Sequence, residues 1–331
     1  MHFNNINYML CSVNAAVLHG LGRTPRFEQF PDPTPGNNEV IVEVRAAALK
    51  SVDKQQANGS HYASPREFPA ICGLDGVGHL ADGSRVFFGG PRRPYGAMAE
   101  RTVAPRAFCF PIPEVVDDLT AAALPNPGVS AWLSLSTRAK LARGETVLIL
   151  GATGVIGKLT VQIAKLLGAG RVIAAGRNQR VLDALHGLGA DVTVQLDKPD
   201  QELSEIFARE LGGGVQVIID YLWGHPTEVL LAALTRREFA AITSETRLVQ
   251  AGESAGPTIS LPAAVLRSTA LTILGTAGIP SRDVLTNAFD EVMARAARGE
   301  LRIDTEAVPL RDIGDAWQRD VQSGRRIVVI P

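Results

Sequence analysis

Residues 146–178 read T-V-L-I-L-G-A-T-G-V-I-G-K-L-T-V-Q-I-A-K-L-L-G-A-G-R-V-I-A-A-G-R-N, and this stretch decides the fold. Its first five residues are apolar and partly β-branched, as is typical of a strand buried on both faces of a parallel sheet. Gly151, Gly154 and Gly157 follow at spacings that allow a tight turn and close packing of the next helix. The pattern predicts a strand, a glycine turn, a helix and a second strand.

The glycine turn matches a dinucleotide-binding fingerprint in its context. The G-x-G-x-x-G spacing is read here from Ala152, Gly154 and Gly157. A helix that begins at such a turn presents free N–H groups to an anion, so we predict that the turn binds a pyrophosphate. An ordinary glycine turn of an α/β protein is the less favoured alternative, because a helix and a second strand follow. The predicted contact residues are Ala152, Thr153, Gly154, Val155, Ile156 and Gly157.

The end of the second strand favours NADPH over NADH. An NAD site normally offers Asp or Glu to the ribose 2′-hydroxyl there, but no carboxylate occurs between Gly151 and Leu182. The chain offers arginine instead, and a guanidinium pairs with a 2′-phosphate through two parallel hydrogen bonds. The alternative for Arg177 is a solvated surface side chain. The residues predicted at this end of the cofactor are Gly176, Arg177, Asn178 and Arg180.

The composition is that of an ordinary globular protein with room for two domains. The chain has 331 residues, of which 46% are hydrophobic and 20% are charged. Lys and Arg total 33 against 34 Asp and Glu, so no net positive field favours nucleic acid or an anionic membrane. We therefore expect small molecules as partners, with no nucleic acid and no membrane.

Targeting and cysteine patterns point to the cytoplasm. No uncharged apolar run approaches the ~18 residues of a membrane helix. The first residues, M-H-F-N-N-I-N-Y-M-L-C-S, lack the basic and apolar regions of a signal peptide. Cys11, Cys72 and Cys109 are too few and too scattered for a disulfide framework. We expect a soluble protein in a reducing cytoplasm.

The sequence pattern divides the chain into two domains. Residues 1–126 contain short apolar runs and turn residues that are typical of strands. From 127 to 259 strands and helices alternate, which predicts a doubly wound parallel sheet. Its strands are predicted near 146–150, 171–175, 191–196, 215–220 and 246–251. Residues 260–331 are predicted to return to the first domain, with a helix near 282–298 and a final strand R-I-V-V-I-P.

Several motifs, in their order along the chain, resemble the medium-chain dehydrogenase/reductase superfamily and its zinc-free quinone oxidoreductase-like branch. They are A-A-V-L-H-G near the start, A-A-A-L-K-S-V-D at 46–53, G-L-D-G-V-G at 73–78, Y-G-A-M-A-E-R at 95–101, A-A-A-L-P-N-P-G-V-S-A-W at 121–132 and the glycine turn. The resemblance covers nearly the whole chain. It implies an α/β protein with a GroES-like, mostly-β catalytic domain (1–126 and 260–331) and a doubly wound Rossmann parallel-sheet domain (127–259).

The resemblance also implies that no metal is bound. Zinc-dependent relatives place a catalytic Cys in the segment that reads here Lys50 to Asp53, and Gly-His-Glu where this chain has Gly73, Leu74 and Asp75. The stretch 87–95 also lacks the cysteines of their structural zinc lobe. With no thiolate and imidazole at ligand spacing, we expect a metal-free site.

Three residues of the first domain are candidates for the catalytic site. Similar quinone reductases have Asn three residues before the Asp of A-x-x-N-x-x-D, and this chain has Lys50 there with Asp53 retained. The Lys50 ammonium either donates a hydrogen bond or proton to substrate or pairs with Asp53 as structure. Tyr62 aligns with a tyrosine that lines the pocket in similar enzymes, and it is either a substrate contact or a packing residue.

The resemblance assigns further residues to the cofactor and to a partner. Ser130 lies where similar proteins bond the phosphates. Loops after three strands of the sheet are expected to face one crevice, because ligands bind at the carboxyl ends of parallel strands. Their candidate residues are Tyr221, Leu222, Trp223, Gly252, Glu253, Gly275, Thr276 and Ala277. Similar proteins commonly dimerise edge to edge, and the strand at 270–275 is the candidate contact of a homodimer.

Together these residues predict an NADPH-dependent, metal-free reductase that transfers a hydride to a quinone or another conjugated carbonyl acceptor. Such acceptors delocalise the added charge, so the site needs a dry cleft and one hydrogen-bond donor rather than a Lewis acid. One alternative is a reductase of alkenal or enoyl-thioester double bonds. Another is a non-catalytic NADPH-binding sensor or scaffold, since a fold does not fix a function.

Overall fold

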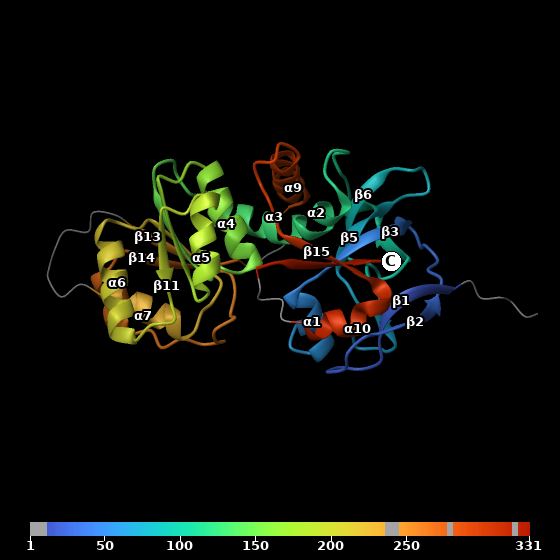
Figure 1. Cartoon of the computed structure of the whole chain (residues 1–331), viewed down its shortest axis with the longest axis horizontal. Coiled ribbons are helices and arrows are strands. Elements are labelled where there is room, and N and C mark those ends of the chain that lie inside the picture. Colours follow the sequence, from blue (N-terminus) through green and yellow to red (C-terminus); the bar gives the residue numbers. More distant parts are fainter. Residues whose placement is uncertain (1–11, 236–244, 277–280, 320–323) are drawn as a thin grey trace, which may run out of the picture. The chain divides into compact units, whose positions relative to one another are not determined.

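The computed structural model describes residues 12–235, 245–276, 281–319 and 324–331. They form two units, each with its own sheet structure. The first unit extends to Leu124 and resumes at Asp304, while the second runs from Pro125 to Ile303 and includes Gly324. In Figure 1 the first unit therefore carries the blue and red ends of the colour scale, and the second carries green to orange.

The first unit consists mainly of strands. Strands β2, β1 and β4 form one antiparallel sheet, and a larger sheet has the order β15-β16-β3-β5-β6-β8 with β7 paired to β3. The elements are β1 (Ser12–Leu18), β2 (Arg26–Pro31), β3 (Glu39–Leu49), α1 (Ser51–Asn58), β4 (Ala70–Ile71), β5 (Asp75–His79), β6 (Arg85–Gly89), β7 (Arg101–Pro105), β8 (Cys109–Pro111), α2 (Asp118–Ala123), β15 (Thr305–Pro309), α10 (Ile313–Gln318) and β16 (Arg326–Ile330). Because β16 pairs antiparallel with β3, the end of the chain completes a sheet begun near its start.

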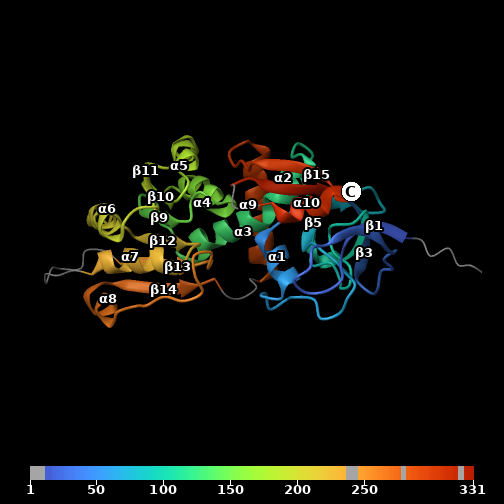
Figure 2. The ribbon, with the colours of Figure 1, turned by 60° about the horizontal axis from the view of Figure 1, so that its bottom comes forward.

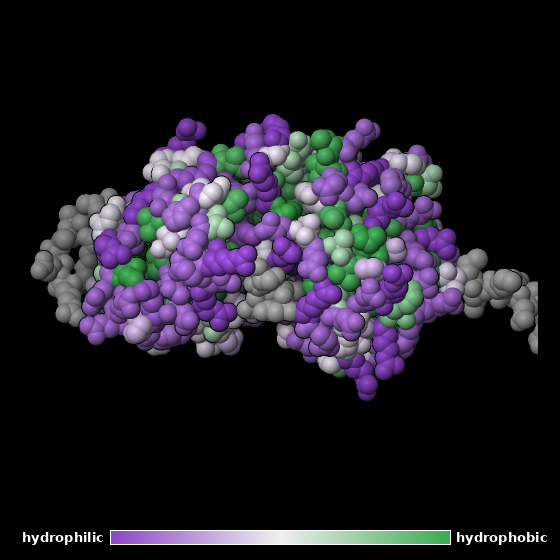
Figure 3. All heavy atoms as spheres, viewed as in Figure 1, coloured by the Kyte–Doolittle hydropathy of each residue, from purple (hydrophilic) through white to green (hydrophobic). Residues whose placement is uncertain are grey.

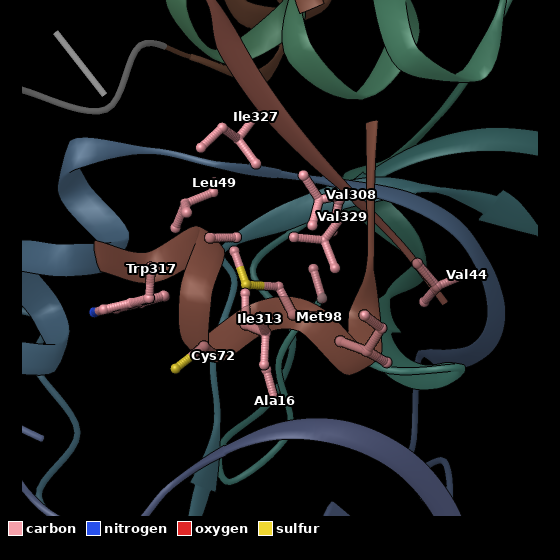
Figure 4. Packing of buried hydrophobic residues seen from close by; sticks show 14 of the residues in the cluster. Ala16, Val44, Leu49, Cys72, Met98, Val308, Ile313, Trp317, Ile327 and Val329 are labelled. Carbon is pink, nitrogen blue, oxygen red and sulfur yellow. The ribbon is translucent and has the colours of Figure 1, made fainter. Parts of the chain in front are cut away.

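The core of the first unit joins residues from both ends of the chain. In the first half of β3 buried and less buried residues alternate, as expected for a strand with one face on a core. Figure 4 shows Leu49 and Met98 packed with Val308, Ile327 and Val329 from the C-terminal segment. This apolar burial holds the returning C-terminal segment against the N-terminal strands.

The second unit is a parallel sheet with helices. The strand order is β11-β10-β9-β12-β13-β14, and every neighbouring pair is parallel. The elements are α3 (Pro125–Leu133), β9 (Thr146–Leu150), α4 (Val155–Leu166), β10 (Arg171–Gly176), α5 (Gln179–Leu185), β11 (Val192–Gln195), α6 (Asp200–Gly212), β12 (Val217–Asp220), α7 (His225–Leu234), β13 (Thr246–Gln250), α8 (Ala263–Ser268), β14 (Leu271–Gly275) and α9 (Arg282–Ala297). This order, in which β9 lies between β10 and β12, is that of a dinucleotide-binding sheet.

Helices bury one face of this sheet. Side chains of α6, α7 and α8, among them Phe207, Leu230 and Val265, pack on Leu148 and Ile218 of the central strands. Figure 2 shows α7 and α8 beside β13 and β14. Residues 147–150 are completely buried, so both faces of β9 are covered, as its continuous apolar sequence predicts.

The structure confirms the predicted fold class and moves one domain boundary. The strand at 146–150 lies where it was predicted, and the other four predicted strands of the second unit agree within two residues. The first unit, however, resumes at Asp304 rather than at 260. The physical reason is that β14 pairs in parallel with β13, so the apolar strand at 271–275 extends the dinucleotide sheet.

One face of each unit is mainly polar. Figure 3 shows polar side chains over most of one face of each unit, with apolar ones interspersed, which is usual for a folded protein surface. No helix in the described part of the chain is long and apolar enough to cross a membrane.

Candidate functional site

The turn between β9 and α4 has a backbone geometry that suits an anion. Gly151 has a φ of +83°, which favours glycine, and Gly154 is the extended N-cap residue of α4. No described side chain caps this helix start, and its first turn contains no acidic residue. The first N–H groups of α4 lie outside the helical ladder, so they and the helix dipole favour a bound phosphate.

Two glycines allow neighbouring segments to approach this turn closely. A Cβ on Gly157 would lie 2.3 Å from the carbonyl oxygen of Gly151 and 2.6 Å from Cα of Ala152. A Cβ on Gly176, at the end of β10, would lie 2.4 Å from Cγ2 of Thr153. The backbone of the turn is therefore packed directly against α4 and β10, which fits close approach to a pyrophosphate.

The residues after β10 separate into two roles. Arg177 and Arg180 are exposed, so their guanidinium groups can reach a ligand in solvent. Asn178 instead caps α5, because its Oδ1 accepts a hydrogen bond from the N–H of Val181 at 3.2 Å. A Ser, Thr, Asp or Asn directly before a helix is the sequence signal for such a cap. Asn178 therefore has a structural role at the start of α5.

The loops after β12 and β13 are joined to each other. The Tyr221 phenol is buried and lies 2.7 Å from Oγ1 of Thr160 on α4, so its side chain contacts the core. The Tyr221 carbonyl accepts a hydrogen bond from the Ser254 hydroxyl at 3.0 Å. A Cβ on Gly252 would lie 2.7 Å from the same carbonyl oxygen. The two loops therefore form one packed surface at the carboxyl ends of their strands.

The other cofactor candidates of the second unit lie on its surface. Ser130 is exposed on α3, and Glu253 is exposed after β13. Gly275 and Thr276 are exposed at the end of β14, while Ala277 lies outside the described residues. Because all six strands are parallel, the loops after β9, β10, β12, β13 and β14 leave the same edge of the sheet.

In the first unit Lys50 is buried in an ion pair. Its side chain is only 3% exposed, and its Nζ donates to Oδ1 of Asp75 at 2.8 Å and to the carbonyl of Ala48 at 3.0 Å. Oδ2 of Asp53 lies 3.6 Å from the same Nζ and accepts the Lys50 backbone N–H at 2.8 Å. The ammonium is therefore enclosed by oxygen atoms of the protein.

Arg326 completes a neutral cluster with these residues. It is 8% exposed, and its Nη1 donates to the carbonyl of Leu49 at 3.2 Å. Burial lowers the pKa of Arg326, whereas the charges of Asp53 and Asp75 act in the opposite direction. Burial also raises the pKa of Asp53, opposed chiefly by Lys50. Two cations and two carboxylates thus lie together inside the unit. Arg326 was not predicted as part of this site, although a basic side chain at the start of an apolar strand is a signal that the sequence contains.

A cavity beside Asp53 is too small for a quinone. Its volume is about 10 Å³, which is room for about one water molecule. Arg93 lines it and donates through Nη2 to Oε1 of Gln56 at 2.7 Å. Cys72 also lines it, and burial raises the pKa of its thiol to about 12, so the thiol is protonated at neutral pH. A planar acceptor is not held inside this cavity.

Tyr62 lies in a different setting from Lys50. It is 95% exposed, and its ring lies 4.1 Å from the ring of His61, centroid to centroid, at an interplanar angle of 31°. The phenol is accessible to a ligand, whereas the Lys50 ammonium is not. The structure therefore brings Lys50 together with Asp53 but does not bring either into contact with Tyr62.

A comparison with protein families matches part of the chain. Residues 155–297 match the family model described as zinc-binding dehydrogenase. This segment begins at the first residue of α4 and ends at the last residue of α9, so it covers most of the second unit.

Individual proteins and solved structures extend the similarity to nearly the whole chain. A probable NADPH-dependent quinone reductase of Emericella nidulans is 25% identical, over 93% of this chain and 96% of its own length. An NADPH-dependent alkenal/one oxidoreductase of Arabidopsis thaliana is 28% identical, over 50% of this chain and 47% of its own. The crystal structure of the Thermus thermophilus quinone oxidoreductase, solved also as its NADPH complex, has a TM-score of 0.79 and 26% identity, over 96% of this chain and 100% of that one.

Proposed function

Because this chain belongs to the quinone oxidoreductase-like branch of the medium-chain dehydrogenase/reductase superfamily, we propose that it transfers a hydride to a quinone or another conjugated carbonyl compound. The chain is an NADPH-dependent oxidoreductase. The observation that carries the proposal is the turn at Gly154 to Gly157, whose backbone geometry suits an anion, followed at the end of β10 by two exposed arginines and no carboxylate.

The residues of the first unit do not fit a zinc ion. The family model is described as zinc-binding. In this chain, however, the segments that carry zinc ligands in zinc-dependent relatives contain Lys50 and Asp75, and the Lys50 ammonium pairs with the Asp75 carboxylate. Within the described residues, no three His, Cys, Asp or Glu side chains lie close enough together to hold a metal ion. The Lys50 ammonium thus occupies the position beside the Asp75 carboxylate that a metal ion would need.

Conjugated acceptors suit such a site. When bound, NADPH supplies the hydride, and the protein supplies binding, orientation and a hydrogen-bond donor. A quinone or an enone spreads the charge it receives, so that one donor is enough to hold the developing oxyanion. The exposed Tyr62 hydroxyl is our proposed donor, and the enclosed Lys50 ammonium is assigned to holding Asp53 and Asp75.

The proposal is tested by following NADPH consumption with a chelator present and NADH as control. The acceptors are a benzoquinone, a naphthoquinone, an alkenal and a saturated aldehyde. We expect turnover of conjugated acceptors and none of the saturated aldehyde. Turnover of the saturated aldehyde that the chelator abolishes would contradict the metal-free mechanism, and tight NADPH binding without any turnover would favour a sensor or scaffold.

Arg177→Ala is expected to weaken NADPH binding by about 1.5–3 kcal/mol, the usual value of a hydrogen bond to a charged group. This corresponds to roughly 10- to 150-fold in the dissociation constant. NADH has no 2′-phosphate, so its affinity should change little. Fluorescence titration of both cofactors measures this, with Arg209→Ala on α6 as an exposed arginine control. Equal losses for the two cofactors would refute the assignment of Arg177.

A second candidate function is the reduction of alkenal double bonds. The similarity to an NADPH-dependent alkenal/one oxidoreductase favours it, and the cofactor geometry would be the same for both reactions. The acceptor panel separates the two, because the better substrate is ranked by kcat/KM. The reduction of enoyl-thioester double bonds is a further candidate reaction of the same kind.

The assembly and location are proposals of the same kind. β14 is the edge strand of the parallel sheet, and its Ile273 is 36% exposed, which suits edge-to-edge pairing in a homodimer. Cys72 and Cys109 are free thiols, which suits the reducing cytoplasm. Sedimentation at micromolar concentration reports the dimer, and a monomer there would rule it out.

A further inference from the structure

We propose that Asp220, a buried carboxylate at the end of β12, is a positioning residue that holds the two NADPH-binding loops after β12 and β13 in one conformation. The inference rests on the proposed function, because it assumes that these loops contact the cofactor. The Asp220 side chain is completely buried, so a ligand that approaches from solvent does not contact it.

One oxygen of Asp220 fixes the backbone of the first loop. Oδ1 accepts hydrogen bonds from the backbone N–H groups of Leu222 at 2.8 Å and Trp223 at 2.9 Å. Trp223 has a φ of +54°, a left-handed conformation that residues with a side chain rarely adopt. The carboxylate therefore stabilises a strained turn at a residue predicted to contact the cofactor.

The other oxygen of Asp220 ties the loop to the following helix. Oδ2 accepts the hydroxyl of Thr227, on α7, at 2.7 Å. Burial raises the pKa of Asp220, and the hydrogen bonds from Thr227, Trp223 and Leu222 oppose this rise, so they stabilise the charged form; no cation of the described residues contributes to the shift. A buried carboxylate without a cation is costly unless every oxygen is satisfied, which makes the geometry of its donors well defined.

The first loop in turn fixes the second. The Asp220 carbonyl accepts the N–H groups of Ala251 at 2.8 Å and Gly252 at 3.1 Å, and the N–H of Ala255 bonds to the Leu222 carbonyl at 2.8 Å. Gly224, which follows Trp223, leaves no room for a side chain, since a Cβ there would lie 2.8 Å from the Ala255 carbonyl oxygen. A shift at Trp223 would therefore be transmitted to the loop that carries Gly252.

The test compares Asp220→Asn with a matched variant, Glu210→Gln. Glu210 is also a buried carboxylate of the second unit, but it lies on α6 and pairs with Arg171. Asn keeps the shape of Asp220 while removing its charge. Titration of the ligand-free proteins with NADPH and with NADH, together with their melting temperatures, is the measurement.

We expect Asp220→Asn to weaken the binding of both cofactors at least tenfold, whereas Glu210→Gln binds them like the wild type at a similar loss of melting temperature. Equal loss for NADPH and NADH distinguishes loop positioning from contact with the 2′-phosphate. Thr227→Val removes only the hydroxyl donor, so a smaller loss in the same direction is expected, and this variant serves if Asp220→Asn does not fold.

Two results would overturn the inference. If Asp220→Asn and Thr227→Val lower the melting temperature but keep wild-type affinity, Asp220 supports the fold alone. If Glu210→Gln loses affinity equally, the effect is general destabilisation. A wild-type protein that fails to bind NADPH would instead contradict the proposed function, so the two failures are distinguishable.

Discussion

Lys50→Met is expected to lower the free energy of unfolding by about 3–5 kcal/mol, because it removes one partner from a buried ion pair. The Met side chain is unbranched and one atom shorter than that of Lys, and the variant leaves Asp53 and Asp75 with Arg326 as the remaining cation of the cluster. An uncompensated carboxylate in a low-dielectric interior is far more costly than a missing apolar contact. The measurement is denaturant unfolding followed by tryptophan fluorescence in a protein whose Trp132 and Trp223 are replaced by Phe, so that the signal comes from Trp317 in the core of the first unit.

The control for Lys50 is the double variant Lys50→Met with Asp75→Asn. It removes a charge of each sign, so it should recover part of the stability lost in the single variant. A single-variant loss below about 1 kcal/mol, the usual value of a surface pair, would mean that the ammonium does not balance the cluster. Turnover by the folded Lys50→Met protein would also exclude Lys50 as the proton donor.

The defect of Lys50→Met should also depend on pH. Burial raises the pKa of Asp53 above its ordinary value of 3.8, so the folded state binds protons more readily than the unfolded chain. A group of this kind contributes stability at low pH, and the contribution is lost as the pH rises through the folded pKa. Loss of Lys50 removes the main opposing charge. We therefore expect the variant to be less destabilised in mildly acidic buffer than at neutral pH.

Gly157→Ala is expected to lower the free energy of unfolding by up to about 3 kcal/mol, the upper end of the usual cost of overpacking, and to weaken NADPH binding. The new Cβ would lie 2.3 Å from the Gly151 carbonyl oxygen and 2.6 Å from Cα of Ala152. Both neighbours belong to the backbone, so no side-chain rotation relieves the contact and α4 must move away from the turn. Its uncapped N–H groups would then move from the position that favours the pyrophosphate.

The control for Gly157 is Gly187→Ala. Gly187 is in the same unit, and a Cβ there would have no heavy atom within 4 Å, so its variant should bind NADPH like the wild type. Titration calorimetry and thermal unfolding of both proteins separate lost affinity from lost stability. Wild-type affinity in Gly157→Ala would show that the turn after β9 does not hold the cofactor.

The second unit could be predicted in detail because its signals are local. The apolar run 146–150, the three glycines and the amphipathic helix all lie within one stretch of chain, and each restricts the backbone or its packing directly. The structure confirmed the strands and the fold class. The boundary at Ile303 was missed because the apolar sequence at 271–275 predicts a strand but does not show which sheet that strand joins.

The sequence by itself determined the dinucleotide fold, its glycine turn and the absence of a carboxylate after β10, since these depend on residues close along the chain. Only the tertiary structure decided that Lys50 pairs with Asp75, that Arg326 reaches the carbonyl of Leu49 across 277 positions, and that Asp220 holds two loops. The physical reason is that a buried charge pairs with whichever residue the folded chain brings next to it. The spacing of residues along the sequence does not show which distant segments lie side by side in the fold.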